Sequence, residues 1–318
     1  MTTVDLTNPI FSDPDKAREH FESIRWPDGP YCPCCGQFDR VKALGGKSMG
    51  PGWYHCMDCR KKFTAAVGTI YERSHIPMTK WLLATHLMCA SKKGVSAHQL
   101  HRMLGLPYKT AWFMAHRIRE GMRDLSPGQL GGEGVTVEAD ETYVGGKEKN
   151  KHRSKRRADH IGGVGKEMVF SLVERQGRVR SHHLANISAK NLRPLLEEQL
   201  ADASATNLMT DGEGQYRLIG SMFKSHQVVN HGIGEYVRGD AYTNTVEGYF
   251  SILKRGIVGT YHHVSGQHLK RYLAEFDFRY NERSALNVTD AERAVKAVRG
   301  VIGKRMTYQQ SACRRAAA

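Results

Sequence analysis

GVTVEADETYV, residues 134–144, is the stretch of sequence that best indicates the fold. From Val135 to Ala139 every second residue is apolar, which is typical of a β-strand with one face toward a hydrophobic core. The same alternation places Glu138 and Asp140 on the opposite face. A carboxylate near the end of a strand, beside the cleft of a domain, is a candidate metal ligand, and we assign that role to Asp140.

The segments after this strand alternate in a way that is typical of a mixed α/β domain. We expect, in chain order, strands at 167–175 and 178–185, a helix at 188–201, a strand at 206–211, a short helix at 214–223, a strand at 226–230, and helices that start near Thr243 and at Gly266. Three strands followed by alternating helix and strand is the order of a ribonuclease-H-like domain. We therefore expect an α/β catalytic domain of this type at residues 134–290.

Two further acidic residues stand where they could join Asp140. Asp211 follows an expected strand, and Glu247 lies in the expected helix on a polar stripe with Asn244 and Lys254. Three carboxylates repel one another unless they hold cations, so the grouping predicts a site for two Mg²⁺ ions that act on a phosphodiester. Lys254, two turns after Glu247, would contact a phosphate. Each acid alone also suits a turn or an exposed surface, and their joint occurrence favours the site.

The cysteines indicate a second, structural metal site. Cys32 and Cys35 form one Cys-x-x-Cys pair, and Cys56 and Cys59 form another. Two such pairs complete the tetrahedral shell of four thiolates that Zn²⁺ prefers, and a filled shell leaves no position for catalysis. Cys34 offers an alternative ligand, but the two-residue spacer favours Cys35. We therefore expect a zinc ribbon at residues 31–68.

The remaining segments are assigned from periodicity. We expect an amphipathic helical lead-in at residues 1–30, a helical DNA-binding region at 69–125, a glycine-rich linker before residue 134, and a basic tail at 291–318. Within the helical region, a short Gly-Leu-Pro break separates two helices, and the later helix carries Arg and His. This pattern suits a helix-turn-helix, although a plain helical bundle fits almost as well.

Composition narrows the classes of function. The 318 residues include 47 Lys and Arg against 32 Asp and Glu, a formal net charge of +15, and 40% are hydrophobic. Such a chain is a globular protein with a polyanionic partner rather than a disordered one. Because it shows no membrane-spanning run and no signal-peptide pattern, we expect a cytoplasmic location without a membrane partner.

One charge run is a candidate DNA contact. Residues 147–157, KEKNKHRSKRR, lie between the first two expected strands, and a solvated loop that contacts phosphates fits them. The residues that we expect to bind DNA are Lys151, Arg153, Lys155, Arg156 and Arg157, together with Lys254 and Arg255 on the later helix.

Several motifs resemble a known family. VEADETYVGG at 137–146, LMTDGEGQY at 208–216 and the run from NTVEGYFSILKRG to FRYNER at 244–283 look like those of bacterial insertion-sequence DDE transposases. The cysteine motifs CPCCG and CMDC, with the segment FTAAVGTIYERSHIPMTKWLLA that follows them, are similar to the ISXO-like subgroup. The resemblance covers about residues 30–285, and the last motif is its most specific part.

The resemblance implies a transposase that cuts and joins DNA with Mg²⁺ or Mn²⁺. Asp140 and Asp211 would be the first two acids and Lys254 the trailing lysine. Related members have either an acidic residue or Asn as the third ligand, so Glu247 and Asn244 both qualify, and we favour Glu247. The implied partners are the terminal inverted repeats of the element and target DNA, bound by at least a dimer in the bacterial nucleoid.

Two other functions fit part of the pattern. A zinc-ribbon transcription factor or other DNA-binding protein without catalysis accounts for the charge and the cysteines, but leaves the carboxylates and Lys254 unexplained. A repair or recombination nuclease on the same fold predicts cleavage without joining.

Overall fold

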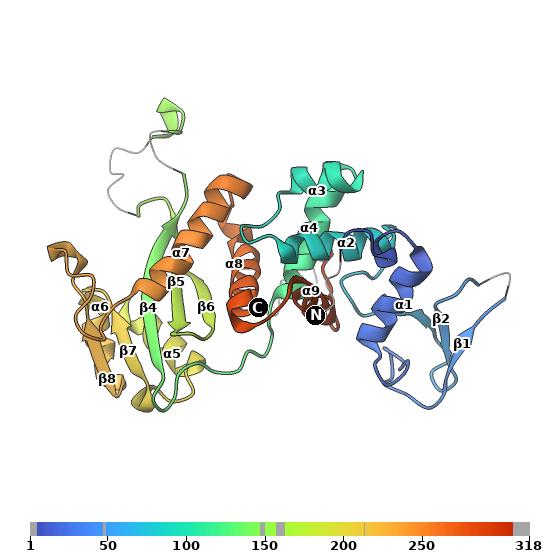
Figure 1. The fold of residues 1–318 in the computed structure, drawn as a ribbon, viewed down its shortest axis with the longest axis horizontal. Helices are drawn as coiled ribbons and strands as arrows, with labels where there is room; N and C mark the ends of the chain where they lie inside the picture. Colours follow the sequence, from blue (N-terminus) through green and yellow to red (C-terminus); the bar gives the residue numbers. More distant parts are fainter. Residues whose placement is uncertain (1–4, 47–48, 147–149, 157–162, 213, 308–318) are drawn as a thin grey trace. The chain divides into compact units, whose positions relative to one another are not determined.

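The computed structural model describes residues 5–46, 49–146, 150–156, 163–212 and 214–307. They divide into two compact units, shown in Figure 1. The first unit combines residues 1–124 with 282–318, and the second consists of residues 125–281. The second unit is thus inserted into the sequence of the first.

The second unit contains a five-stranded mixed sheet. Its strands are β4 (Thr136–Val144), β5 (Glu167–Glu174), β6 (Val179–Leu184), β7 (Asn207–Thr210) and β8 (Ser225–Val228). They lie in the order β6-β5-β4-β7-β8, with β4, β5 and β6 antiparallel in sequence and β7 and β8 parallel to β4. All five expected strands are confirmed, and the strand from residues 134–144 lies at the centre of the sheet.

Helices cover both faces of this sheet. They are α5 (Ala189–Gln199), α6 (Gly214–Ile219), α7 (Asn244–Gly256) and α8 (Gly266–Asn281), with short helical turns η3 (Arg153–Lys155), η4 (Ala203–Ala205), η5 (Gly220–Met222), η6 (His231–Ile233) and η7 (Ile257–Tyr261). One apolar core joins the sheet to α5 and α6, and a second joins it to α7 and α8. Figure 1 shows α7 crossing β4 and β5.

The alternation in β4 determines which core each side chain enters. Val137 and Ala139 are buried in the core on the α5 and α6 side. Glu138 points to the other side, where it accepts hydrogen bonds from the start of α7. The expected two-faced pattern of this strand is confirmed, and it separates the apolar face from the face that carries Asp140.

The first unit begins with a helix and a small antiparallel sheet. These elements are η1 (Pro9–Phe11), α1 (Pro14–Arg25), β1 (Val41–Leu44), β2 (Trp53–Cys56) and β3 (Lys62–Thr64). Asp13 caps α1 by accepting hydrogen bonds from the N–H groups of Asp15 and Lys16, and Ala17, Phe21 and Ile24 form its buried face. The amphipathic lead-in expected from the sequence is therefore confirmed as a helix.

Three helices follow, within the helical region expected at residues 69–125. They are α2 (Met78–Ala90), α3 (Ala97–Leu104) and α4 (Tyr108–Met122). Gly105 ends α3 in the left-handed conformation with φ 59°, which lets the chain turn within three residues before α4. Arg117 of α4 points inward, because its guanidinium donates to the carbonyl of Glu72 at 2.9 Å and lies over the ring of Trp81. This arginine therefore supports packing within the unit.

Among the described helices of both units, none is long and apolar enough to cross a membrane.

The expectation of a basic tail at 291–318 is wrong for its first part. Residues Asp290–Arg299 form α9, which packs against α2 within the first unit, and Ala297 and Val298 are buried there. Thr289 and Glu292 form a reciprocal capping box at its start, a signal readable as Thr-x-x-Glu that the sequence analysis missed. Residues 308–318 lie outside the described part of the chain.

Arg293 holds α9 in place, and its loss should destabilise the first unit. The buried guanidinium donates to the carbonyls of Cys89 at 2.8 Å and Glu282 at 2.7 Å. We expect Arg293→Ala to leave these carbonyls unpaired and to lower the free energy of unfolding by roughly 2 kcal/mol. Urea denaturation measures the effect, and Arg299→Ala, which removes an exposed arginine of the same helix, should change it little. Equal stability of the two variants would contradict this role of Arg293.

Candidate active site and metal centre

Two of the predicted acids lie side by side at one end of the central strands. β4 pairs in parallel with β7 so that Glu138 lies opposite Met209. Asp140 and Asp211 each follow these partners by two residues, so the register brings them to the same end of the sheet. Asp211 directly follows β7, but Asp140 is the fifth of the nine residues of β4, so the expectation that Asp140 stands at the end of its strand is wrong; the two acids meet where the shorter β7 ends beside β4.

The electrostatics of Asp140 show how close the acids are. Burial of its carboxyl group, followed by the negative charge of Asp211, raises the pKa of Asp140 to about 8. Glu141 and Glu247 add smaller contributions of the same sign. A neighbouring cation would reverse this effect, since it favours the ionised form of each acid. Carboxylate oxygens are the ligands that hard divalent cations such as Mg²⁺ prefer. Among the described residues, the three acids are not grouped at metal-ligand spacing, unlike the four cysteines of the first unit.

Glu247 lies in the first turn of α7, where its negative charge raises the pKa of Asp140. One of its carboxylate oxygens accepts a hydrogen bond from the hydroxyl of Thr243 at 3.1 Å and lies 3.3 Å from Nε2 of His231. His231 in turn stacks on Tyr236, with ring centroids 5.1 Å apart. Asn244, the first residue of α7, has an exposed side chain. The structure therefore places both candidates for the third ligand in the same helical turn, and the charge of Glu247 acts on Asp140.

Glu138 has a partner set that the sequence did not reveal. It is fully buried, and each of its two oxygens accepts two hydrogen bonds. Oε1 accepts from Nε of Arg175 and from the hydroxyl of Thr245, both at 2.8 Å. Oε2 accepts from the backbone N–H groups of Thr245 at 2.8 Å and Val246 at 3.0 Å. A carboxylate has about four acceptor positions, so Glu138 has none left for a metal ion.

The predicted DNA-binding residues lie on two segments of the second unit. Lys254 and Arg255 are exposed in the last turn of α7, and Lys254 lies seven positions after Glu247, a rise of about 10 Å along the helix. Arg153 and Arg156 are exposed in the connection that leaves the carboxyl end of β4. The backbone of Lys155 is described but its side chain is not, and Arg157 lies outside the described residues.

Within the same connection, Lys151 is half-buried. Its carbonyl accepts a hydrogen bond from Nε of Arg156 at 3.0 Å. The connection starts at the end of β4, four residues after Asp140. The basic residues are therefore linked to the strand that carries Asp140.

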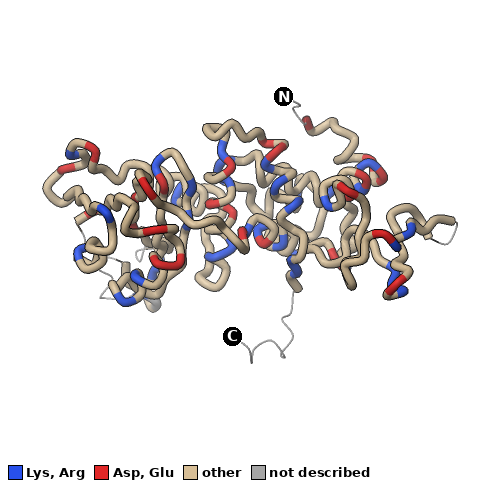
Figure 2. The backbone as a smooth tube through the Cα atoms, turned by 90° about the horizontal axis from the view of Figure 1, so that it is seen from below, with Lys and Arg blue, Asp and Glu red and all other residues tan. Residues whose placement is uncertain are grey.

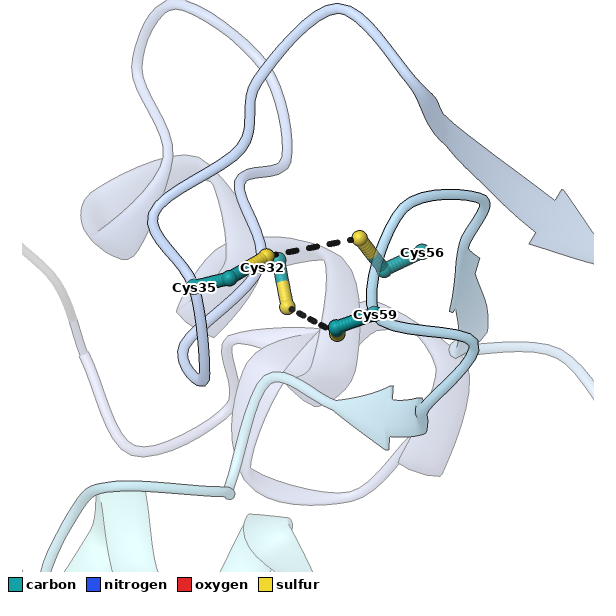
Figure 3. Close-up of side chains that lie close together, drawn as sticks. All are labelled: Cys32, Cys35, Cys56 and Cys59. Atoms are coloured by element: carbon teal, nitrogen blue, oxygen red, sulfur yellow. Dashed lines mark hydrogen bonds between the residues drawn. The ribbon is translucent and has the colours of Figure 1, made fainter.

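Four cysteines form the metal centre of the first unit. Sγ atoms of Cys32, Cys35, Cys56 and Cys59 all lie within 4.8 Å of one another, and Figure 3 shows them converging from two turns. The closest pairs are 3.5 and 3.6 Å apart. Thiolates 2.3 Å from a tetrahedral zinc ion are about 3.8 Å apart, so the arrangement fits Zn²⁺. The exposed Cys34 is not one of this group.

The local backbone prepares Cys32 for metal binding. Burial would raise the pKa of this thiol, but the N–H groups of Cys34 and Cys35 point to it and lower the pKa to about 7. The first of these contacts has an N···S distance of 3.4 Å. A thiol that ionises near neutral pH readily supplies the thiolate that zinc requires.

Aromatic packing joins this metal centre to α1. Trp26 lies edge-on to Tyr54 with centroids 5.1 Å apart, and Tyr54 stacks on Phe63 at 5.8 Å. Tyr54 also donates to Glu22 of α1 at 3.1 Å, and burial together with the charge of Glu22 raises the pKa of Tyr54 to about 12. The helix and the cysteine segment therefore form one folded region.

Comparison with known proteins identifies the family. The chain matches the ISXO2-like transposase domain over residues 129–281 and the transposase zinc-ribbon domain over residues 12–62, a range that includes α1. It is also 32% identical over 276 residues to the "Uncharacterized protein in transposable element ISH50" of Halobacterium salinarum. The aligned region covers 83% of this chain and 90% of the relative. A transposase domain preceded by a zinc ribbon defines the class as DNA transposases of mobile elements. The chain belongs to the ISXO2-like transposase family, as its motifs indicated.

Loss of one predicted zinc ligand should remove the metal and unfold the ribbon. We expect Cys56→Ser to lower the zinc content from about one ion per chain to near zero, because three thiolates leave the tetrahedral shell incomplete. Zinc is measured by atomic emission, and digestion by trypsin reports unfolding. Cys34→Ser is the matched control and should keep both zinc and protease resistance. Zinc loss in the control would mean that Cys34 is a ligand.

Proposed function

We propose that this transposase cuts DNA at the ends of its element and joins those ends to target DNA, using two divalent metal ions. Asp140, Asp211 and Glu247 would hold the ions, which supply an activated water or 3′-hydroxyl and stabilise the leaving oxygen. The observation that carries this proposal is the register of β4 and β7, which places Asp211 beside Asp140; burial and then the charges of Asp211, Glu141 and Glu247 raise the pKa of Asp140 accordingly. In a protein of net charge +15, such a concentration of acids has no role in binding DNA unless cations separate them from it.

The topology supports a ribonuclease-H-like fold for the catalytic domain. Three antiparallel strands lead to two strands parallel to the first, with helices on both faces. In this arrangement the first strand lies at the centre of the sheet, so Asp140 has neighbours on both sides. The family match over residues 129–281 covers this whole sheet.

The remaining residues are assigned by their charge and their positions in the chain. Lys254, about two turns beyond Glu247, would bind a phosphate next to the bond that is cut, and Asn244 would contact the metal ligands or the DNA from the same turn as Glu247. Arg153, Arg156 and Arg255 would bind the DNA backbone. Figure 2 shows that Lys and Arg occur throughout both units, so the zinc ribbon and helical region can also contribute phosphate contacts.

Joining two ends requires that two catalytic sites act together. We therefore propose that at least two copies of the chain assemble on the terminal inverted repeats. The zinc ribbon and the helices α2 to α4 would read the repeat sequence, while the basic residues give affinity that does not depend on sequence.

An excision and joining assay on a plasmid with the native element ends tests the acids. We expect Asp140→Asn and Asp211→Asn to lower the rate of strand cleavage at least about a hundredfold, because each removes a metal ligand. Binding of the ends, measured by gel shift, should remain. Glu247→Gln and Asn244→Ala are compared in the same assay.

The outcomes separate the competing assignments. If Glu247→Gln is inactive and Asn244→Ala is active, Glu247 is the third ligand, and the reverse result moves the role to Asn244. Cleavage without joining would indicate a nuclease. End binding by a wild-type protein that does not cleave would indicate a DNA-binding protein, and full activity of both aspartate variants would overturn the proposed site.

The basic connection between β4 and β5 should contribute to the salt dependence of DNA binding. Each phosphate contact contributes about 0.9 to the slope of log affinity against log salt concentration. We expect the double variant Arg153→Ala/Arg156→Ala to reduce this slope by about 1 to 2, as measured by fluorescence anisotropy. Arg193→Ala, on the exposed face of α5, is the control and should leave the slope unchanged. An unchanged slope in the double variant would exclude the connection from the DNA interface.

A further inference from the structure

Helix α7 brings the third acid to the site, and its position on the sheet depends on one buried carboxylate. The first residue of α7 is Asn244, and Glu247 lies one turn later. Glu138 on β4 accepts hydrogen bonds from the backbone N–H groups of Thr245 and Val246 and from the hydroxyl of Thr245. In a helix the first N–H groups have no partner within the helix, so Glu138 supplies the acceptors that they need.

The same carboxylate is tied to the segment that leads into α7. Arg175, just after β5, donates from Nε to Glu138 at 2.8 Å and from its two terminal nitrogens to the carbonyls of Asp240 and Tyr242, both at 2.9 Å. Its guanidinium also lies over the ring of Tyr242, 3.5 Å from the centroid. Arg175 uses its planar set of donors to connect the sheet, Glu138 and the chain before α7.

Glu138 is separated from Asp140 by one residue of the same strand, on the same face. Asp140 is therefore fixed relative to Glu138 by the backbone of β4, and Glu247 is fixed relative to Glu138 by the backbone of α7. A shift of α7 along the sheet would change the distance between these two acids. The buried carboxylate thus lies at the point where the two elements that carry them are joined.

From this geometry we propose that Glu138, paired with Arg175, is a positioning residue that holds Glu247 at the metal site against the repulsion of Asp140 and Asp211. The inference rests on the proposed function, since it requires these three acids to bind divalent metal. Its role is indirect because all four acceptor positions of Glu138 are filled by protein donors.

The chemistry of the group makes Glu138→Gln the informative substitution. Gln has the same size, but its side-chain amide offers two acceptor positions and two N–H donors. At least two of the four donors around Glu138 would then face another donor, and the helix start would move away. Thr245→Val removes one of the four donors with little change in size, so its effect should be smaller.

Binding of Mn²⁺ to the full-length, DNA-free protein, followed by the electron paramagnetic resonance signal of free Mn²⁺, tests the proposal. We expect Glu138→Gln to raise the dissociation constant about tenfold or more, with Thr245→Val between it and wild type. In cleavage assays, the half-saturating Mg²⁺ concentration should rise in the same order while the KM for DNA stays constant.

A second buried pair in the same unit provides the matched control. Glu275 is also fully buried, contacts Arg279 of α8 and accepts a hydrogen bond from Tyr261 at 2.6 Å. We expect Glu275→Gln to lower the free energy of unfolding, as Glu138→Gln does. Its affinity for Mn²⁺ should nevertheless equal that of wild type. Equal Mn²⁺ affinities for the two variants would overturn the positioning role.

Two further variants in the Mn²⁺-binding experiment separate the possible outcomes. If Glu138→Gln does not fold, Thr245→Val decides, and wild-type Mn²⁺ affinity in that variant would overturn the proposal. Asp140→Asn separates this inference from the proposed function. If Asp140→Asn loses Mn²⁺ and Glu138→Gln binds it normally, the metal site stands and only the positioning role fails. If wild type and Asp140→Asn bind Mn²⁺ equally, or neither binds it, both proposals fail.

Discussion

The burial of Asp140 beside Asp211 is the constraint on which the second unit depends. Burial of Asp140, followed by the negative charge of Asp211 and smaller effects of Glu141 and Glu247, raises the pKa of Asp140 to about 8, and keeping this group ionised costs folding free energy in the absence of cations. Such an arrangement persists only if the surrounding structure holds each acid in place. The parallel pairing of β4 with β7 holds the two aspartates, and the buried contacts of Glu138 hold the start of α7.

The first unit meets a different constraint, because its N-terminal part is too small to form a core. Strands β1, β2 and β3 contain only four, four and three residues. The four thiolates replace that core with metal bonds, and the ring contacts of Tyr54 extend the folded region to α1. Helix α9 then returns after the catalytic unit to pack on α2, so the first unit is complete only when the whole chain has been made.

Several elements were predictable because their signals are local. The helices α1 and α4 follow their apolar periodicity, the strand β4 follows its alternation, and the spacing of the cysteine pairs specifies the group that the structure brings together. Helix α9 also had a local signal in its capping box, but its net positive composition led to the expectation of a tail. The inward position of Arg117 shows the limit of such signals, since charge alone does not say which side of a helix faces solvent.

The sequence by itself determined the family, the cysteine group and the candidate acids, because motifs and spacing are properties of short segments. Only the tertiary structure decided what Glu138 does. In the sequence it is an acidic residue two positions before Asp140, and its alternation with Asp140 suggested a shared face and nothing more. Its partners Arg175, Thr245 and Val246 lie 37, 107 and 108 residues away, so pairing between distant segments had to form before the donors met it. The role of a buried carboxylate depends on the hydrogen-bond donors around it, and long-range packing determines which donors those are.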